Sequence, residues 1–472
     1  MTNGSPALET VCYSPRDGQG ASVVLGGGLA GLAAGYALTR AARKAVLFEA
    51  APAVGGLSRT LSSGPFLYDI GGHRFFTRDR EVDSLVQDLM DGELAPVQRK
   101  SKIYMRGKFF DYPLRPANAL FGLGPFMVMR ILADYGLEKV RGLFARRPDV
   151  SLEDWVVRNF GRTMFTIYFK EYSEKVWGID CSRISQGWVE KRISGLSLST
   201  ALRNAFFKFA GREPPTLVDT FLYPRHGIGR IAERFREEIE KENRVFTDTA
   251  VVRLRHEDLS VRSLDIHNCR KTFTVQGDSY VSTMPLPALV RMMEPAPPPR
   301  VMEAAHSLGF RDLVLVAVKV DRENVTDQTW VYIPERKIPF GRLHEPKVWS
   351  RSMAPEGQTL VVVEYFCFEG DATWSTPDGA LSETTVRGLA DLGFLRPEEV
   401  LGTDVVRVPK AYPLFEVGYE EHCGVIYEYL ERFRNLHLAG RSGTFQYQNM
   451  DHAISSGTAA ARSVLLAEAR RR

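Results

Sequence analysis

The feature that most constrains the fold is a glycine turn near the start of the chain, within ASVVLGGGLAGLAAGYALTRAARKAVLFEA. The run SVVL predicts a buried strand, the residues after the turn predict a helix, and AVLFEA predicts a second strand. Gly26, Gly28 and Gly31 lie at this turn, and Glu49 ends the second strand. Such glycines allow a tight turn, close approach to a pyrophosphate and close helix packing, while the acid suits a ribose. The segment therefore predicts a dinucleotide-binding strand–helix–strand unit.

Two neighbouring patterns bear on this prediction. Residues 21–39 carry no charge and are long enough for a membrane span, but five glycines and the leading strand pattern disfavour a membrane helix. The loop APAVGGLSRT places a second glycine pair, Gly55 and Gly56, before Ser58 and Arg59. The pair indicates a second backbone approach to the phosphates, and an ordinary loop is the alternative.

Composition narrows the class of protein. A chain of 472 residues exceeds what one hydrophobic core usually supports, so roughly two or three lobes are expected. The 61 basic residues are nearly balanced by 57 acids, which disfavours nucleic acid as a partner and is compatible with small anionic ligands. Five dispersed cysteines disfavour a disulfide framework or a zinc site, and the first twenty residues lack a signal-peptide pattern. We expect a cytoplasmic protein with reduced thiols and no stable membrane insertion.

The order of patterns along the chain predicts several inserted parts. Residues 97–112 predict a hairpin turning at Arg106 and Gly107, and residues 115–210 are mainly helical. Because the first and last segments share a strand–glycine–helix pattern, we predict one nucleotide-binding domain made of discontinuous pieces. The predicted limits are 1–20 for a flexible tail, 21–95, 215–290 and 400–472 for the nucleotide-binding domain, 115–210 for a helical domain, and 96–114 with 300–399 for a sheet domain.

Four blocks of the sequence carry a family resemblance. The glycine turn with VLFEA and GGLSRT resembles the FAD-binding start of the amine oxidase and protoporphyrinogen oxidase superfamily. GGHRFFT, YFKEYSEKVWG and GRSGTFQYQNMDHAI are similar to segments of the UDP-galactopyranose mutases. The resemblance implies FAD as the cofactor. It also implies an α/β fold: a Rossmann-like FAD domain of the glutathione reductase type, an inserted helical domain and an antiparallel substrate-binding sheet.

The resemblance also implies a chemistry and a partner. In the mutases, N5 of reduced flavin attacks the anomeric carbon of a nucleotide-activated sugar, and the sugar recloses with a different ring size without net redox change. The implied partner is a nucleotide sugar. An external reductant such as NAD(P)H would keep the flavin reduced, and a homo-oligomer is possible.

Individual positions inherit roles from this resemblance. Catalytic roles are implied for His73, Arg74, Arg342 and Arg441. The implied cofactor-binding residues are Gly26, Gly28, Leu29, Ala30, Gly31, Glu49, Gly56, Leu57, Ser58, Gly72, His73, Val252, Gly440, Arg441, Asn449 and Met450. The implied substrate-binding residues are Tyr172, Trp177, Arg192, Arg342, Tyr412 and Tyr447. Among them, Trp177 would stack on a base, and Arg192, Arg342, Tyr412 and Tyr447 would contact the diphosphate. No metal site is expected.

Each of these roles has a plainer alternative. His73 could be a satisfied turn histidine, Trp177 a core residue at a helix end, and Arg192 or Arg342 a solvated surface cation. The sequence also departs from the mutase pattern. Arg74 replaces a small apolar residue, Phe76 replaces a second histidine, and the Tyr-Asp-Met of the mutases reads Gln448-Asn449-Met450. These changes make the site more positive and put UDP-galactose in doubt more than the nucleotide sugar class.

Three functions therefore stay open. A redox-neutral mutase is preferred, because the expected cleft residues are arginines and tyrosines. An FAD-dependent oxidoreductase of the amine oxidase or protoporphyrinogen oxidase type is the alternative, and such enzymes favour an apolar tunnel in which these groups would be costly. A protein that keeps FAD as a structural or sensing element is the third.

Overall fold

The structure is a computed structural model that describes residues 21–105, 107–112, 124–144, 149–188 and 220–470. A five-stranded parallel sheet has the order β20-β13-β1-β2-β9. Its strands are β1 (Ser22–Leu25), β2 (Ala45–Phe48), β9 (Arg244–Phe246), β13 (Ser279–Ser282) and β20 (Leu436–Leu438). Helix α1 (Leu29–Arg40) joins β1 to β2, which pair in parallel, so the predicted strand–helix–strand unit is confirmed.

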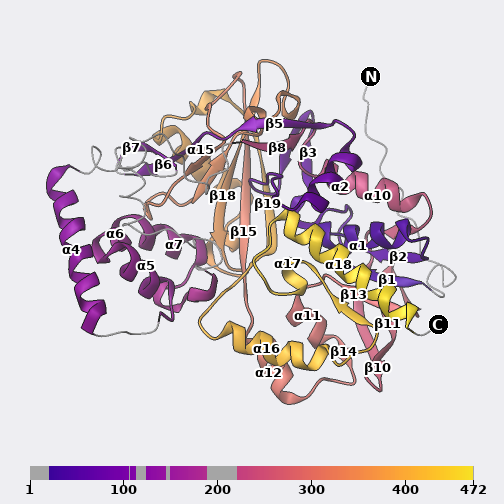
Figure 1. The fold of residues 1–472 in the computed structure, drawn as a ribbon. Helices are drawn as coiled ribbons and strands as arrows, with labels where there is room; N and C mark the ends of the chain where they lie inside the picture. The colour runs from indigo at the N-terminus through magenta and orange to yellow at the C-terminus, as the bar shows by residue number, and fades with distance from the viewer. Residues whose placement is uncertain (1–20, 106, 113–123, 145–148, 189–219, 471–472) are drawn as a thin grey trace.

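Helix α1 is covered by the end of the chain. Helix α18 (Met450–Ala469) packs along α1, as Figure 1 shows in indigo and yellow, and a β-carbon on Gly457 would overlap the carbonyl oxygen of Ala30. Helix α10 (Arg230–Glu240) also packs against α1. The segment that is long enough for a membrane span is instead divided between β1 and a 12-residue helix. Within the described ranges, no helix is long and apolar enough to cross a membrane.

A seven-stranded sheet occupies the middle of Figure 1, with the order β19-β15-β18-β17-β16-β6-β7. The strands are β6 (Ser101–Met105), β7 (Lys108–Asp111), β15 (Phe310–Val320), β16 (Trp330–Tyr332), β17 (Arg342–His344), β18 (Thr359–Cys367) and β19 (Val400–Pro413). All neighbours are antiparallel except β16 and β6. Strands β6 and β7 form the predicted hairpin, with Met105 opposite Lys108.

The seven-stranded sheet also corrects one predicted limit. The sequence patterns assign residues 400–472 to the nucleotide-binding domain, but β19 pairs with β15 from Phe310 opposite Pro413 to Val320 opposite Val400. This strand therefore extends the antiparallel sheet beyond residue 399. The other domain limits stay a prediction.

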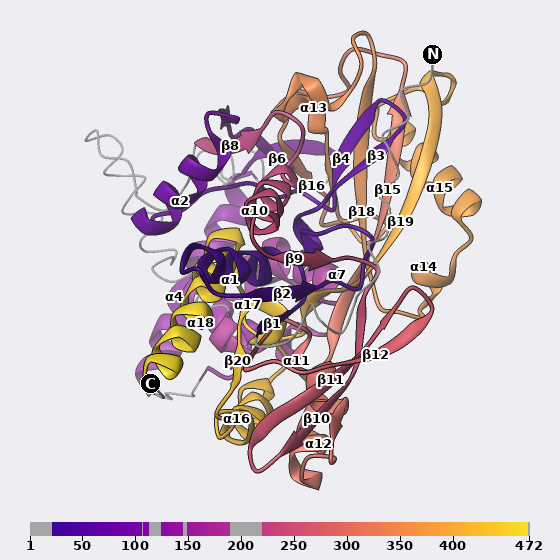
Figure 2. The ribbon, with the colours of Figure 1, turned by 90° about the vertical axis from the view of Figure 1, so that its right-hand side faces the viewer.

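Smaller sheets complete the fold. A four-stranded sheet with the order β12-β11-β10-β14 lies below the parallel sheet in Figure 2. Its strands are β10 (Ala250–Glu257), β11 (Ser260–Asn268), β12 (Lys271–Val275) and β14 (Met293–Glu294). One two-stranded sheet pairs β3 (Thr60–Ser63) with β4 (Phe66–Asp69). Another pairs β5 (Leu94–Gln98) with β8 (Thr220–Pro224). The sequence patterns do not single out β11, because polar residues alternate irregularly with its apolar ones.

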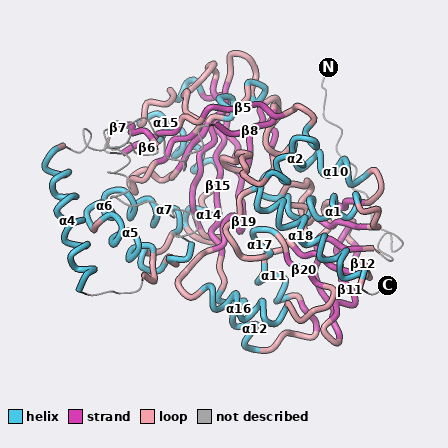
Figure 3. Tube along the Cα trace, viewed as in Figure 1, coloured by secondary structure: helices cyan, strands magenta, loops and turns pink. Residues whose placement is uncertain are grey.

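Figure 3 shows the helices in cyan, with one group, α4 to α7, set apart to the left of the central strands. This group contains α4 (Pro125–Phe144), α5 (Leu152–Phe160), α6 (Arg162–Met164), the π-helical turn η2 (Phe165–Lys170) and α7 (Glu171–Trp177), all within the segment predicted to be helical. The other helices are η1 (Gly56–Ser58), α2 (Arg80–Met90), η3 (Cys181–Arg183), α11 (Leu286–Arg291), α12 (Pro299–Ser307), α13 (Pro346–Trp349), η4 (Arg351–Met353), α14 (Ala372–Ser375), α15 (Asp378–Asp391), η5 (Pro397–Glu399), α16 (Tyr419–Leu430) and α17 (Gly440–Gly443). The predicted α/β fold, with a parallel sheet beside antiparallel sheets, is confirmed.

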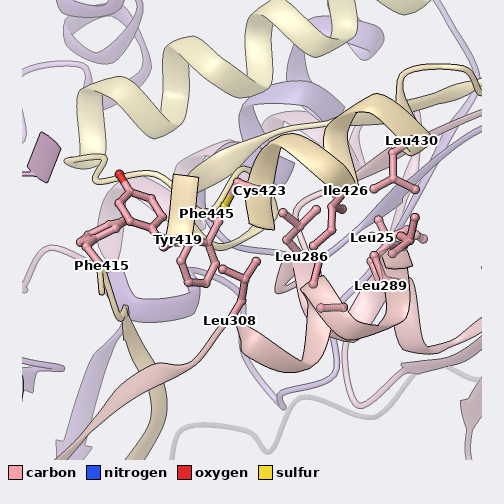
Figure 4. Packing of buried hydrophobic residues seen from close by; sticks show 14 of the residues in the cluster. Leu25, Leu286, Leu289, Leu308, Phe415, Tyr419, Cys423, Ile426, Leu430 and Phe445 are labelled. Atoms are coloured by element: carbon pink, nitrogen blue, oxygen red, sulfur yellow. The ribbon is translucent and has the colours of Figure 1, made fainter. Parts of the chain in front are cut away.

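A buried apolar cluster supports the end of the molecule at which β19 leads into α16. Figure 4 shows leucines of α11 and α16 packing towards one another beside Phe415 and Phe445, both of which are at most 1% exposed. Cys423 of this cluster is a free thiol, as are Cys181 and Cys367, and burial raises the pKa of each to about 12. Cys269 is disulfide-bonded, so the expectation that every thiol is reduced is wrong for this residue.

Candidate functional site

The first glycine turn has the geometry that its sequence predicts. Gly26 has a φ of +103°, and a β-carbon there would overlap the hydroxyl of Thr283. A β-carbon on Gly31 would overlap the carbonyl oxygen of Gly26, so the helix can approach the strand this closely only with glycine. At Gly28 a β-carbon would meet nothing within 4 Å. Open space therefore faces the start of α1.

The second glycine pair lies directly against the first turn. The backbone N–H of Gly55 donates to the carbonyl of Gly27 over 2.7 Å, and a β-carbon on Gly56 would come within 3.2 Å of the Cα of Gly28. Gly55 and Gly56 have φ values of +108° and +56°, which favour glycine. Arg59 then donates from Nε to the carbonyl of Gly56 over 3.0 Å. The pair extends the glycine surface, as the sequence indicates.

Glu49 lies at the edge of this glycine surface. Its Oε2 accepts a hydrogen bond from the backbone of Gly27 at 2.6 Å, and its Oε1 accepts one from Ala51 at 2.8 Å. The backbone of Thr249, one residue before β10, donates to the Glu49 carbonyl over 2.8 Å. Val252 follows on β10 at a register shift and is 50% exposed. The start of β10, which carries the predicted cofactor-binding residue Val252, is therefore held next to Glu49.

His73 follows a turn that only glycines can form. Gly71 has a φ of +80°, and a β-carbon on Gly72 would overlap Nε1 of Trp330. The ring of His73 is partly buried, with Nδ1 at 3.3 Å from the Gly71 carbonyl. Burial and the nearby Arg441 lower the pKa of His73 to about 4, so its imidazole is neutral near pH 7.

The side chain of Asp69 fixes the start of this turn through hydrogen bonds, a role that the sequence does not reveal. Its fully buried carboxylate accepts hydrogen bonds from Tyr223 at 2.6 Å, Thr60 at 2.6 Å and the backbone of Ile228 at 3.1 Å. Burial raises the pKa of Asp69 to about 6, although these hydrogen bonds favour the ionised form. The turn is therefore tied to the neighbouring strand β3 and to residues 223–228, which are distant in sequence.

A buried ion pair stands beside the turn. Arg342 of β17 and Glu364 of β18 are opposite one another in the sheet, and their side chains form an ion pair. Burial alone would raise the pKa of Glu364, but the Arg342 guanidinium lowers it to about 2. Arg342 also donates to the hydroxyl of Tyr412 over 3.3 Å. With 17% of its side chain exposed, Arg342 is a partly buried residue of the site and not the solvated surface cation of the alternative.

Aromatic residues surround a second arginine. The guanidinium of Arg441 lies 4.6 Å from the ring centre of Tyr412 and 5.1 Å from that of Tyr447. Tyr172 lies near Arg342, and burial raises its pKa above the usual range while the arginine opposes this shift. Such cation–π contacts hold the guanidinium of Arg441 without neutralising its charge. Five predicted residues, His73, Tyr172, Arg342, Tyr412 and Arg441, thus gather around Glu364, which the sequence does not single out.

Trp177 is placed differently from its expected role. It is only 4% exposed, and its ring packs edge-on against Trp188 at 4.9 Å and Phe415 at 5.9 Å. A base could not stack on a ring that is covered in this way without moving its neighbours. The geometry matches the alternative reading of Trp177 as a core residue at the end of a helix.

Helix α7, which carries Tyr172 and Trp177, is fixed by two buried cations that the sequence does not reveal. Lys175 donates from Nζ to the carbonyls of Ile333 at 2.9 Å, Glu335 at 2.9 Å and Ile338 at 2.7 Å. Burial lowers the pKa of Lys175 to about 7, although the acids Glu171 and Glu335 oppose this shift. Arg311 of β15 donates from Nε to the carbonyl of Val176 over 3.0 Å. Lysine and arginine side chains that satisfy backbone carbonyls at depth cannot be recognised from local patterns.

The remaining predicted residues lie at the edge of the candidate site, except Arg192, which is outside the described residues. Arg74 is partly buried, with its guanidinium 5.7 Å from the ring centre of Trp330. Gly440 has a φ of +78°, and a β-carbon there would lie 2.7 Å from Cβ of Ala30, so α17 adjoins the start of α1. Leu29, Ala30, Ser58 and Met450 are buried, Leu57 is partly buried, and the exposed Asn449 precedes α18 without a side-chain cap.

The residues at the glycine surface fit a dinucleotide with a flat ring system. Helix α1 has no side-chain cap at its first turn, so backbone N–H groups and the positive end of the helix dipole face the open space at Gly28. A pyrophosphate at this position would accept hydrogen bonds from these N–H groups. Gly56 would support it from the other side, and the Gly71–His73 turn and α17 lie further along. This arrangement can hold FAD.

Comparison with known proteins agrees with this geometry. Residues 29–465 match the family model of flavin-containing amine oxidoreductases. Coproporphyrinogen III oxidase of Bacillus subtilis (strain 168) is 21% identical, over 95% of this chain and 98% of its own. A crystal structure of reduced UDP-galactopyranose mutase has a TM-score of 0.81 at 24% identity, covering 95% of this chain and 96% of that one. A putative protoporphyrinogen oxidase from Exiguobacterium sp. 255-15 has a TM-score of 0.73 at 18% identity, covering 95% and 99%.

The chain belongs to the family of flavin-containing amine oxidoreductases, because the family model covers most of its length. It is a flavoprotein, and FAD is its cofactor. The solved structures share the fold with this chain.

Proposed function

We propose that this flavoprotein is a mutase that isomerises the ring of a nucleotide-activated sugar between pyranose and furanose forms. The observation that carries the proposal is the cluster of Arg342, Arg441, Tyr412 and Tyr447 beside His73. Two guanidinium groups and two tyrosines suit a diphosphate that must leave as an anion and return. The similarity to reduced UDP-galactopyranose mutase over 95% of the chain supports the same assignment.

In this proposal each residue has a limited task. Reduced FAD supplies the nucleophile that the anomeric carbon requires. Arg342 and Tyr412 bind the diphosphate, and Arg441 adds a second positive charge beside the rings of Tyr412 and Tyr447. The neutral imidazole of His73 holds one proton and can donate it in a hydrogen bond beside the isoalloxazine. Lys175 and Arg311 fix α7, so that Tyr172 stays beside Arg342.

A second candidate is an FAD-dependent oxidoreductase. The coproporphyrinogen III oxidase of Bacillus subtilis matches 95% of this chain, which supports an oxidative reaction as directly as the mutase structure supports isomerisation. The polar cluster argues against an apolar substrate, because arginine and tyrosine side chains are costly to desolvate in a cavity built for one.

Anaerobic turnover separates the two candidates. The FAD-loaded protein is reduced with dithionite and mixed with a panel of UDP- and dTDP-hexoses, and isomers are followed by chromatography. A mutase forms isomer only with reduced flavin, and Tyr412→Phe lowers the rate because one diphosphate donor is lost. Tyr429→Phe on α16, a partly buried tyrosine that contacts Phe433, serves as the control and leaves the rate unchanged. Substrate-driven bleaching of oxidised flavin by a porphyrinogen or amine, with peroxide formed in air, rejects the mutase.

A further inference from the structure

A histidine that no predicted role includes lies behind the buried ion pair. His344 is 0% exposed, and among the residues that the structure describes neither of its ring nitrogens has a hydrogen-bond partner. Its ring stacks on Trp349 of α13, with 5.0 Å between the ring centres and 15° between the planes. A buried polar group without a partner is unfavourable, and such groups are rare enough to call for an explanation.

Strand geometry places His344 beside Glu364. His344 lies two residues after Arg342 on β17, so both side chains emerge on the same face of the sheet, and Glu364 is opposite Arg342 on β18. One carboxylate oxygen of Glu364 pairs with Arg342. The other oxygen is buried without a hydrogen-bond partner and lies 3.7 Å from Nδ1 of His344. The same oxygen faces the backbone of the turn at Gly71, where a β-carbon would lie 3.7 Å away.

The positive charge of Arg342 neutralises the negative charge of Glu364 fully only while Arg342 has no second anionic partner. Burial lowers the pKa of His344, Arg342 lowers it further and Glu364 opposes this, so the imidazole is neutral. The other titratable or charged groups that face the pair are Tyr172 of α7, Tyr412 of β19, and His73 and Arg441. A diphosphate bound at Arg342 brings negative charge next to a carboxylate that is 0% exposed. His344, with Nδ1 at 3.7 Å from the second oxygen of Glu364, is placed to compensate for this charge.

We infer that His344 is a proton-accepting positioning residue: when a diphosphate engages Arg342, His344 takes up one proton from solvent and becomes the ion partner of the second oxygen of Glu364. An N–H bond forms on the imidazole, a water or buffer molecule gives up the proton, and no electrons move. The carboxylate then keeps its place while Arg342 shares its charge with the ligand. The inference rests on the proposed function for the diphosphate, but not on the identity of the sugar or base.

Calorimetry measures this proton directly. The FAD-loaded protein is titrated with UDP, and separately with inorganic pyrophosphate, at pH 7 in PIPES and in Tris, whose ionisation enthalpies differ. The expected result is an uptake approaching one proton per bound ligand. The affinity should then fall by up to tenfold per pH unit as the pH rises between the pKa values of His344 in the free and bound protein.

Two variants assign the proton. His344→Gln cannot titrate in this range, so proton uptake should fall to near zero and the affinity should lose its pH dependence. His344→Leu should do the same without lowering the melting temperature, because it removes an unpartnered polar group from a sealed site. A merely structural histidine would instead lower the melting temperature and leave the uptake unchanged. His306→Gln on the exposed face of α12 is the control and should behave as the wild type.

The outcomes separate this inference from the proposed function. Ligand binding without proton uptake in the wild type overturns the inference and leaves the mutase assignment standing. Uptake that survives in both His344 variants also overturns it and assigns the proton elsewhere, with His73 the next candidate. If neither UDP nor pyrophosphate binds, the proposed function and the inference fall together.

Discussion

The glycine surface forms a cradle, and this cradle and the cationic cluster differ in how they contact a ligand within one site. The cradle, formed by residues 26–31 with Gly55 and Gly56, presents backbone to its ligand, and its geometry depends on the absence of side chains. The cluster around Arg342 and Glu364 presents charged side chains from separate strands and helices, held by mutual contacts in a buried place. The structure of the first region should therefore depend on side-chain volume, and that of the second on side-chain charge. Substitutions that alter one property at a time can test this contrast.

The largest effect is expected from Gly31→Val. Its β-carbon would overlap a backbone oxygen that cannot move aside, and overpacking of this kind costs about 3 kcal/mol or more. We expect loss of bound FAD and of most folded protein, measured by flavin absorbance and thermal unfolding. Gly28→Ala is the matched control: nothing lies within 4 Å of the new carbon and φ is −70°, so the protein should fold normally but bind FAD more weakly. A Gly31→Val protein that purifies yellow with an unchanged melting temperature would contradict the volume argument.

The charge of the cluster is tested by Glu364→Gln. The change keeps the shape of the side chain but leaves Arg342 without its buried counter-ion, which typically costs about 3–5 kcal/mol. The measurement is the denaturant midpoint of the FAD-loaded protein. Glu383→Gln removes a carboxylate that is 72% exposed and pairs with Arg387, so less than about 1 kcal/mol is expected. Equal losses of stability in the two variants would show that the buried ion pair of Arg342 and Glu364 contributes no more than a surface ion pair.

A somewhat smaller loss is expected from Lys175→Met, which leaves three buried carbonyls without their donor. We expect a loss of about 2–3 kcal/mol, together with weaker binding of UDP, because α7 would no longer be tied to the segment before β17. Lys241→Met, at a side chain that is 64% exposed, is the control for loss of a lysine charge. Unchanged UDP affinity in a destabilised Lys175→Met protein would limit this lysine to a structural role.

The smallest effect is a pH dependence that His73 imposes on stability. Its pKa is about 4 in the folded protein and 6.5 in the unfolded chain, so the unfolded state binds more protons between these values. Stability should therefore be complete above pH 6.5 and fall as the pH drops towards 4, by about 1 kcal/mol after allowing for partial exposure of the ring. His73→Asn should flatten this part of the profile relative to His306→Asn. Parallel profiles for the two variants would exclude His73 as the source.

The same contrast explains what could be predicted from the sequence. The cradle follows from spacing alone, because the strand, turn and helix that shape Gly26, Gly28 and Gly31 are contiguous. His73 and Arg441 could be named through the family resemblance. Glu364, His344 and Lys175 could not, because their partners are set by the register of β17 against β18 and by the packing of α7, which no local pattern encodes. For Trp177 the family resemblance implies a base-stacking role, which stays a prediction, and the packing of Trp188 and Phe415 against its ring could not be predicted from the sequence.

The contact between Gly457 and Ala30 sets an order of events during synthesis. The first helix of the cradle leaves the ribosome early, but α18, which covers it, follows only after more than four hundred further residues. A nascent chain therefore exposes the apolar side of α1 for nearly the whole of its translation, and chaperones or partly folded neighbours must shield it meanwhile. A chain cut short before residue 457 would lack this contact, and we expect it to accumulate as a colourless, protease-sensitive product.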